Sequence, residues 1–112
     1  MKVRLTVFFF LLLSSASFAQ DSPELYRSSY SSAVQSGQFE SAIAIAEDWK
    51  RDEPKKVIPY YLAAKALSKK GRKNAAMKNL REALTIDSLH VPSLLAYAEL
   101  SNSESLEYFE KL

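Results

Sequence analysis

The chain contains no cysteine, only two glycines and a single histidine among its 112 residues. Without cysteine it has no disulfide framework, no thiolate metal site, no thiol nucleophile and no attachment point for the lipid of a lipoprotein. Gly37 and Gly71 lie 34 residues apart, so they do not form a glycine-rich phosphate-binding loop. The length allows one small domain at most.

The first nineteen residues have the organisation of a secretory signal peptide. Lys2 and Arg4 precede a nine-residue run, LTVFFFLLL, which is followed by small residues up to Ala19. A helix that spans a bilayer needs about 20 apolar residues, so this run is too short to be one. We predict a signal peptide at residues 1–19, cleavage after Ala19 and a periplasmic or secreted domain at residues 20–112. The alternative is an uncleaved anchor.

Charge is balanced overall but unevenly distributed. Without residues 1–19, the chain has equal numbers of basic and acidic residues. The net charge is −4 over residues 20–49, +9 over residues 50–81 and −5 over residues 82–112. A neutral, exported chain gives no support for nucleic-acid binding, so we expect no nucleic-acid partner.

The chain after residue 20 repeats with a period of 34. The pairs that share this offset are Gly37 and Gly71, Ala42 and Ala76, and Tyr26 and Tyr60. Apolar residues recur at helical spacing between the glycines and prolines, and no stretch alternates long enough to be a strand. The chain is therefore predicted to be all-α. The predicted helices are residues 23–35, 39–50, 57–68, 73–86 and 92–100, with a short sixth at 104–111 that Ser103 caps and that carries Leu106, Tyr108 and Phe109.

This organisation resembles the tetratricopeptide repeat, a 34-residue helix–turn–helix unit with the pattern W-x2-L-G-x2-Y, A-x3-F and P. The unit that fits best contains Tyr60, Ala63, Ala64, Leu67, Gly71, Ala76, Leu80 and Ala83. The resemblance defines units at about residues 23–56, 57–90 and 91–112, the third of them shortened. It implies a solenoid of antiparallel helix pairs, with five to six helices in two and a half to three repeats and a concave groove lined by the first helix of each pair.

Close packing of antiparallel helices, at about 8–10 Å, needs small residues where the helices cross. The residues expected at these crossings are Ala64, Ala76, Ala83 and Ala98, and the larger residues expected beside them are Tyr60, Leu67, Leu80 and Leu94. The first unit exchanges large and small residues in pairs. Tyr30 is large where the pattern has a small residue, and Ala33 is small where it has a large one. Trp49 and Ala46 show the same exchange, so the packed volume is conserved.

The resemblance also implies a partner-binding surface. The residues it places there are Arg27, Ser31 and Gln35 from the first unit, Tyr61, Lys65, Ser68 and Lys69 from the second, and Leu95 and Glu99 from the third. Together they would form a mixed groove for a protein or peptide partner. The family's carboxylate clamp is not reproduced, because Arg27, Ser31 and Leu62 occupy its positions. The alternative is that Arg27 and Lys65 are ordinary solvated residues and that Tyr61 packs between repeats.

Two further surfaces are open to interpretation. Residues 69–73, KKGRK, are either a solvated turn or a salt-sensitive docking patch for an acidic partner or an anionic envelope surface. Two units and part of a third are few for a repeat array, so we expect exposed apolar surface at one end. That surface motivates the hypothesis of a homo-oligomer or of an array completed by a partner.

Catalytic and metal chemistry find no support in the sequence. Asp87, Ser88 and His90 have the residue types of a hydrolase triad, but they lie too close together to align as one. One histidine cannot make a zinc site, so we predict no metal and no cofactor. The sequence predicts a non-catalytic protein–protein interaction module or adaptor of the cell envelope, without stable membrane insertion after cleavage. The alternative function is a self-assembling structural subunit with no transient ligand.

Overall fold

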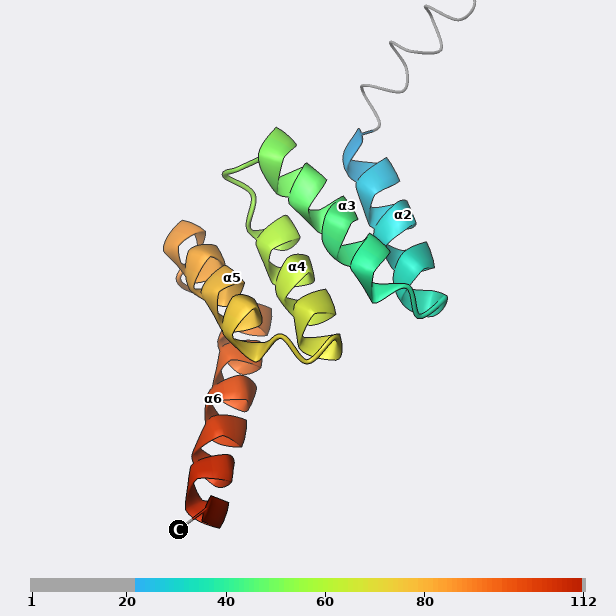
Figure 1. The fold of residues 1–112 in the computed structure, drawn as a ribbon. Helices are drawn as coiled ribbons and strands as arrows, with labels where there is room; N and C mark the ends of the chain where they lie inside the picture. The colour runs from blue at the N-terminus through green and yellow to red at the C-terminus, as the bar shows by residue number, and fades with distance from the viewer. Residues whose placement is uncertain (1–21, 112) are drawn as a thin grey trace, which may run out of the picture.

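The computed structural model describes the backbone of residues 22–111 and the side chains of residues 23–102. Within this range the chain forms five α-helices joined by short turns, and it contains no strand (Figure 1). The helices are α2 (Ser22–Gln35), α3 (Phe39–Asp52), α4 (Val57–Lys69), α5 (Lys73–Ile86) and α6 (Val91–Lys111). The predicted all-α class is confirmed. The bounds of α5 coincide with the prediction, and those of α2, α3 and α4 differ from it by at most two residues.

The same type of turn joins α2 to α3 and α4 to α5. The glycine N–H bonds to the carbonyl three residues before it, and the next N–H bonds to the carbonyl five residues before its own. The two N···O distances are 3.0 and 2.8 Å after α2, and 3.0 and 2.9 Å after α4. This Schellman motif requires a left-handed residue, and φ is 73° at Gly37 and 79° at Gly71. The 34-residue period of the sequence is therefore also a period in backbone geometry.

Each described helix packs against the next one along the chain, from α2 through to α6. The result is a stack of antiparallel helices in which α6 stands at one end and α2 at the other (Figure 1). Alanine lines the seams, and the alanines that are at most 2% exposed are Ala42, Ala46, Ala63, Ala64, Ala66, Ala76 and Ala83. Small side chains let the backbones approach closely, as predicted for Ala64, Ala76 and Ala83.

The exchanged large and small residues of the first pair, Tyr30, Ala33, Ala46 and Trp49, are all buried. Tyr30 is 7% exposed and Ala33 is 6% exposed, and both belong to one core cluster with alanines of α3 and α4. The Tyr30 hydroxyl donates a hydrogen bond of 2.8 Å to the carbonyl of Leu62, which links α2 to α4. Burial raises the pKa of Tyr30 to about 12, and the neighbouring Tyr61 adds to the shift. A large phenol fits here because its polar end has a partner.

The last helix corrects the prediction. Residues 92–100 and 104–111 were expected to be separate helices, but α6 is continuous from Val91 to Lys111. The Ser-Asn-Ser segment at residues 101–103 has no glycine or proline, so nothing in it forces the helix to stop. The third unit is therefore a single helix rather than a pair. The side chains of Leu106, Tyr108 and Phe109 lie outside the described residues.

Two core predictions fail for the same reason. Ala98 was expected at a helix crossing and Leu94 beside it, but both are exposed, Leu94 by 43%. They lie on the face of α6 that would meet a following helix, and no helix in the described part of the chain covers that face.

Tyr60, also expected in the core, is half-buried, and its hydroxyl donates to the carbonyl of Pro54 at 2.8 Å.

Candidate functional site

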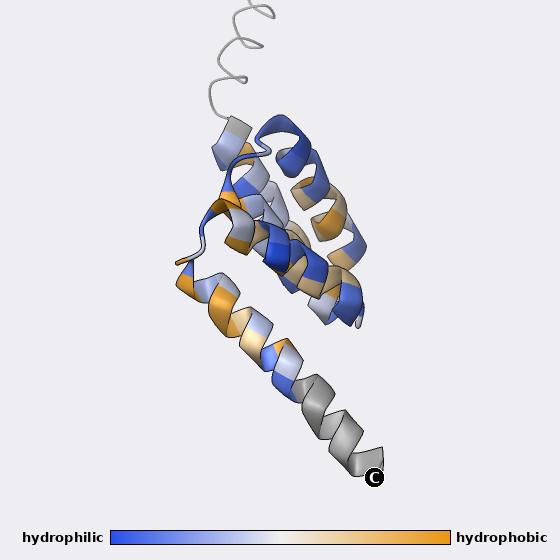
Figure 2. Cartoon of the chain, turned by 90° about the vertical axis from the view of Figure 1, so that its left-hand side faces the viewer, coloured by the Kyte–Doolittle hydropathy of each residue, from blue (hydrophilic) through white to orange (hydrophobic). Residues whose placement is uncertain are grey.

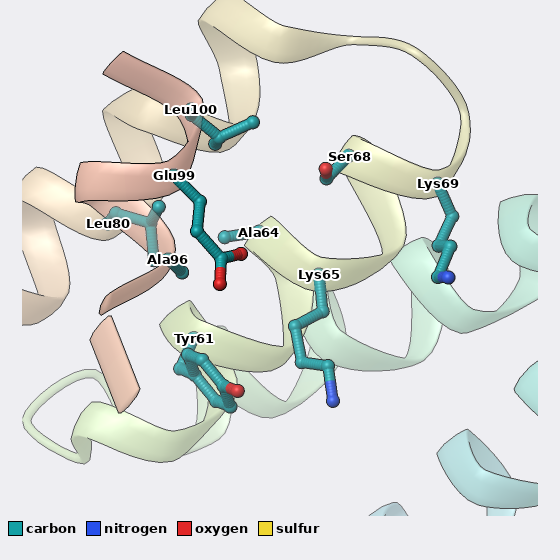
Figure 3. Close-up of a pocket in the computed structure, with 9 residues that line it drawn as sticks. All are labelled: Tyr61, Ala64, Lys65, Ser68, Lys69, Leu80, Ala96, Glu99 and Leu100. Atoms are coloured by element: carbon teal, nitrogen blue, oxygen red, sulfur yellow. The ribbon is translucent and has the colours of Figure 1, made fainter. Parts of the chain in front are cut away.

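The strongest candidate site is a groove between α4 and α6, with a volume of about 250 Å³ (Figure 3). Its apolar lining comes from three helices: Ala64 of α4, Leu80 of α5, and Ala96 and Leu100 of α6. Ala64 and Leu80 are 2% and 0% exposed, so this lining is part of the packed core. The groove exists because an alanine at the crossing leaves space that no other side chain in the described range fills.

The polar walls come from the predicted surface. Tyr61, Lys65 and Lys69 recur every four residues along α4, and this spacing places them on one face of the helix. Glu99 reaches across from α6, and Ser68 completes the lining (Figure 3). The structure thus brings five of the nine predicted surface residues into one groove: Tyr61, Lys65, Ser68, Lys69 and Glu99.

The charges of this groove are available to a ligand. Lys65, Lys69 and Glu99 are all exposed, and none of the ion pairs among the described residues involves them. The Lys65 ammonium lies 5.6 Å from the centroid of the Tyr61 ring, a cation–π contact. The two lysines provide a positive wall with an aromatic face beside it, and the carboxylate stands on the opposite side.

A histidine that was not predicted to belong to the site packs against Tyr61 of the groove wall. The Tyr61 ring meets the His90 ring edge-on, with centroids 5.5 Å apart and planes at 73°. His90 Nδ1 lies 2.7 Å from the hydroxyl oxygen of Ser93, whose residue is fully buried. In the sequence, the only signal for the His90–Ser93 contact is the three-residue spacing of these two residues at a helix start. The contact from His90 stabilises the position of the Tyr61 ring.

Asp87, Ser88 and His90, which have the residue types of a hydrolase triad, make separate contacts in the structure. His90 bonds to Ser93 rather than to Ser88, and Asp87 Oδ1 accepts the backbone N–H of Leu89 at 3.1 Å. The three side chains are therefore not aligned for proton transfer. Among the described residues, no cluster of three or more acidic or histidine side chains could hold a metal ion.

The predicted residues of the first unit lie apart from the groove. Arg27, Ser31 and Gln35 line a shallow depression formed by α2 alone. The Arg27 guanidinium lies 5.7 Å from the centroid of the Trp49 ring, which is 3% exposed. Arg27 thus covers the edge of the core, which favours its interpretation as a packing residue. Leu95 is 60% exposed and is not part of the groove lining.

Trp49 is the centre of a cluster that fixes the first helix pair. The Tyr26 and Trp49 rings are stacked, with centroids 5.6 Å apart and planes at 8°. Trp49 Nε1 donates to Glu53 at 2.7 Å, and the Tyr26 hydroxyl donates to Asp52. The hydrogen bond to Asp52 raises the pKa of Tyr26 to about 12, with burial adding to it. The contacts of Tyr26 with Trp49 and Asp52 therefore tie α2 to α3.

The basic turn between α4 and α5 is partly neutralised. Arg72 forms a hydrogen-bonded ion pair with Glu40 of α3, and the Lys70 ammonium lies 3.8 Å from the same carboxylate. Lys73 Nζ is buried and has no hydrogen-bond partner in the described part of the chain. Lys69 alone of these residues lines the groove. This turn therefore ties α3 to the second pair, which favours its interpretation as a structural element.

A comparison with known protein families and with curated proteins finds no match to this chain.

Proposed function

We propose that this protein is an exported, non-catalytic interaction module of the tetratricopeptide-repeat type, which holds a segment of a partner protein between α4 and α6. The observation that carries the proposal is the groove itself, in which an apolar floor is flanked by Tyr61, Lys65, Lys69 and Glu99. Two glycine turns of the same geometry, 34 residues apart, and alanine at the seams support the repeat type.

The size of the groove favours a peptide over a small molecule. Pockets for small molecules usually have volumes of about 300–1,000 Å³ and enclose most of the ligand. The groove has about 250 Å³ and is not fully enclosed, which suits one or two side chains of a longer segment. Such a segment would place an apolar side chain on the floor at Ala64 and Leu80.

The charges define the polar part of the partner. Lys65 and Lys69 lie one helical turn apart and have no ion-pair partner within the described range, so they would bind acidic side chains of the segment. Glu99 would bind a basic or amide group on the other side. The expected partner segment thus combines acidic residues with an apolar anchor.

The experiment is affinity capture from the native compartment with three chains: the unchanged protein, Lys65→Glu/Lys69→Glu, and Lys55→Glu/Lys78→Glu. The third is a matched control, because Lys55 and Lys78 are exposed outside the groove and undergo the same change of charge. We expect a partner that the groove variant binds at least tenfold more weakly, that the control retains, and that raised salt releases. Retention by the groove variant would contradict the proposal, and so would equal loss in both variants.

Export belongs to the same proposal. Its support is the order of basic, apolar and small residues at positions 1–19, which lie outside the described residues. None of the described helices is both long and apolar enough to cross a membrane. The alternative function, a self-assembling structural subunit, depends on a different surface, the free face of α6.

A further inference from the structure

The large hydrophobic side chains that are exposed in the described range all lie within ten residues of one another. They are Ile86 (38% exposed), Leu89 (80%), Val91 (59%), Leu94 (43%) and Leu95 (60%). Figure 2 shows this hydrophobic segment at the start of α6, on the side of the molecule that faces the viewer, where no other helix covers it. Contiguous apolar surface of this kind marks an interaction site in a soluble protein.

Helical spacing turns part of this segment into a stripe. Val91, Leu94, Leu95 and Ala98 stand at positions i, i+3, i+4 and i+7 of α6, and all four are exposed. The opposite side of the same helix packs against α4 and α5 through Ala96, Tyr97 and Leu100. The first turns of α6 are therefore apolar on two sides, of which only one is covered. The α6 apolar face is defined here as Val91, Leu94, Leu95 and Ala98, with Ile86 and Leu89 at its margin.

We propose that the α6 apolar face pairs with the same face of a second copy, forming a two-fold symmetric dimer. The first reason is charge. Between residues 86 and 102 the only acidic side chains are Asp87 and Glu99, and there is no lysine or arginine. A surface that meets its own copy must avoid placing like charges opposite one another, and a face with almost no charge satisfies that condition. The same scarcity of charge gives a charged partner nothing to pair with.

The second reason is the difference between the two ends of the described stack. The outer surface of α2 is polar and exposes Ser28, Ser31 and Ser32, which is typical of a capping helix. A head-to-tail array would bury the apolar end of one copy against this polar surface and would extend without closing. Pairing of α6 with α6 covers both apolar faces and leaves both polar ends in water.

The size of the face indicates a weak and reversible dimer. Obligate dimers bury more than about 1,000 Å² on each partner, whereas the described face consists of a few side chains on one helix and its preceding turn. Self-association should therefore depend on protein concentration. It should depend little on salt, since few charges take part.

The first test is sedimentation equilibrium of the purified chain with its natural N-terminus, over a wide range of concentration. We expect the mass to rise from that of one chain to twice that mass and no further. Leu95→Glu and Leu89→Glu should each lower the fraction of dimer at least tenfold, because both residues are exposed in the monomer and the changes do not disturb its core. Ser28→Glu on α2 is the control and should leave the mass unchanged. A single-chain mass at every concentration would overturn the proposal, and so would growth beyond two chains.

The second test does not depend on the variants' stability. The natural chain has no cysteine, so one introduced cysteine reports a single contact. Ala98→Cys is a small change at an exposed position of the face and should form a disulfide-linked dimer under mild oxidation. Ser28→Cys should remain monomeric under the same conditions. Cross-linking of a mixture of the two variants to each other, without the Ala98→Cys homodimer, would show a head-to-tail array and overturn the two-fold arrangement. Both tests omit any groove ligand, so their outcome is independent of the proposed peptide site.

Discussion

At the scale of single residues, the backbone of the repeat depends on two glycines. Gly37 and Gly71 both adopt positive φ, and each ends the first helix of its pair. A Cβ placed at either position would meet no atom within 4 Å, so the requirement for glycine is conformational rather than steric. The position of both turns could be predicted from the sequence because glycine is rare in this chain.

Gly71→Ala should lower the free energy of unfolding by about 1–2 kcal/mol, which is the cost of the left-handed conformation for a residue with a side chain. Gly71→Asn should recover part of that loss, since asparagine tolerates this region better. Urea denaturation measures both variants. Asn74→Ala at an exposed position of α5 is the control and should change stability by less than about 0.5 kcal/mol. A Gly71→Ala variant as stable as this control would contradict the proposed turn.

Tyr30 predicts a loss of stability at high pH. Its pKa is raised from 10.0 to about 12 in the folded protein by burial, so the folded state holds the phenol proton more tightly than the unfolded chain does. The resulting stabilisation is fully present below pH 10 and is lost as the pH rises towards 12. Two pKa units correspond to about 2–3 kcal/mol at most. Melting curves between pH 8 and 12 should therefore show a smaller decline for Tyr30→Phe than for the natural chain and for the control Tyr97→Phe. Equal declines would rule out this role for Tyr30.

At the scale of helices, the bounds from α2 to α5 follow from glycine, proline and the apolar spacing, which are local properties. The continuation of α6 beyond residue 100 could not be predicted from these local properties, because the polar segment at residues 101–103 is compatible with both a break and a continuing helix. The exposure of Ala98 and Leu94 also could not be predicted, since their spacing fits a seam but no helix in the described part of the chain covers them.

The groove shows the same division between local and non-local information. The four-residue spacing along α4 was sufficient to place Tyr61, Lys65 and Lys69 together. The contact of His90 with Tyr61, and the closure of the floor by Leu80, depend on how α5 and α6 lie against α4. Neither contact has a sequence signal that differs from ordinary helix packing.

Packing at a seam predicts that the same substitution at two neighbouring alanines changes the free energy of unfolding by very different amounts. Ala76 is fully buried between helices, and Ala75 beside it is exposed. Ala76→Leu should therefore lower the free energy of unfolding by about 1–3 kcal/mol through overpacking, and Ala75→Leu should leave it nearly unchanged. Thermal or urea denaturation of the two variants measures the difference. Full tolerance of leucine at position 76 would be incompatible with the close approach of α4 and α5.

At the scale of the whole described molecule, we propose separate roles for two surfaces. The groove between α4 and α6 has unpaired charges over an apolar floor, which suits a transient partner segment. The α6 apolar face has almost no charge, which suits a second copy. The surface of α2 is polar and closes the other end of the stack. In a dimer joined at α6, each chain would contribute one groove. The dimer could then bind two partner segments at once, which increases avidity.

The most direct test of the central claim, that the groove holds a partner segment, is site-specific photo-cross-linking in the organism that makes the protein. A photoreactive residue at Ser68 lies in the groove lining, and one at the exposed Asn74 of α5 lies outside it. We predict a covalent adduct with a specific different protein from position 68, through a segment containing acidic and apolar residues, and none from position 74. The absence of an adduct at position 68, or the same adducts from both positions, would contradict it.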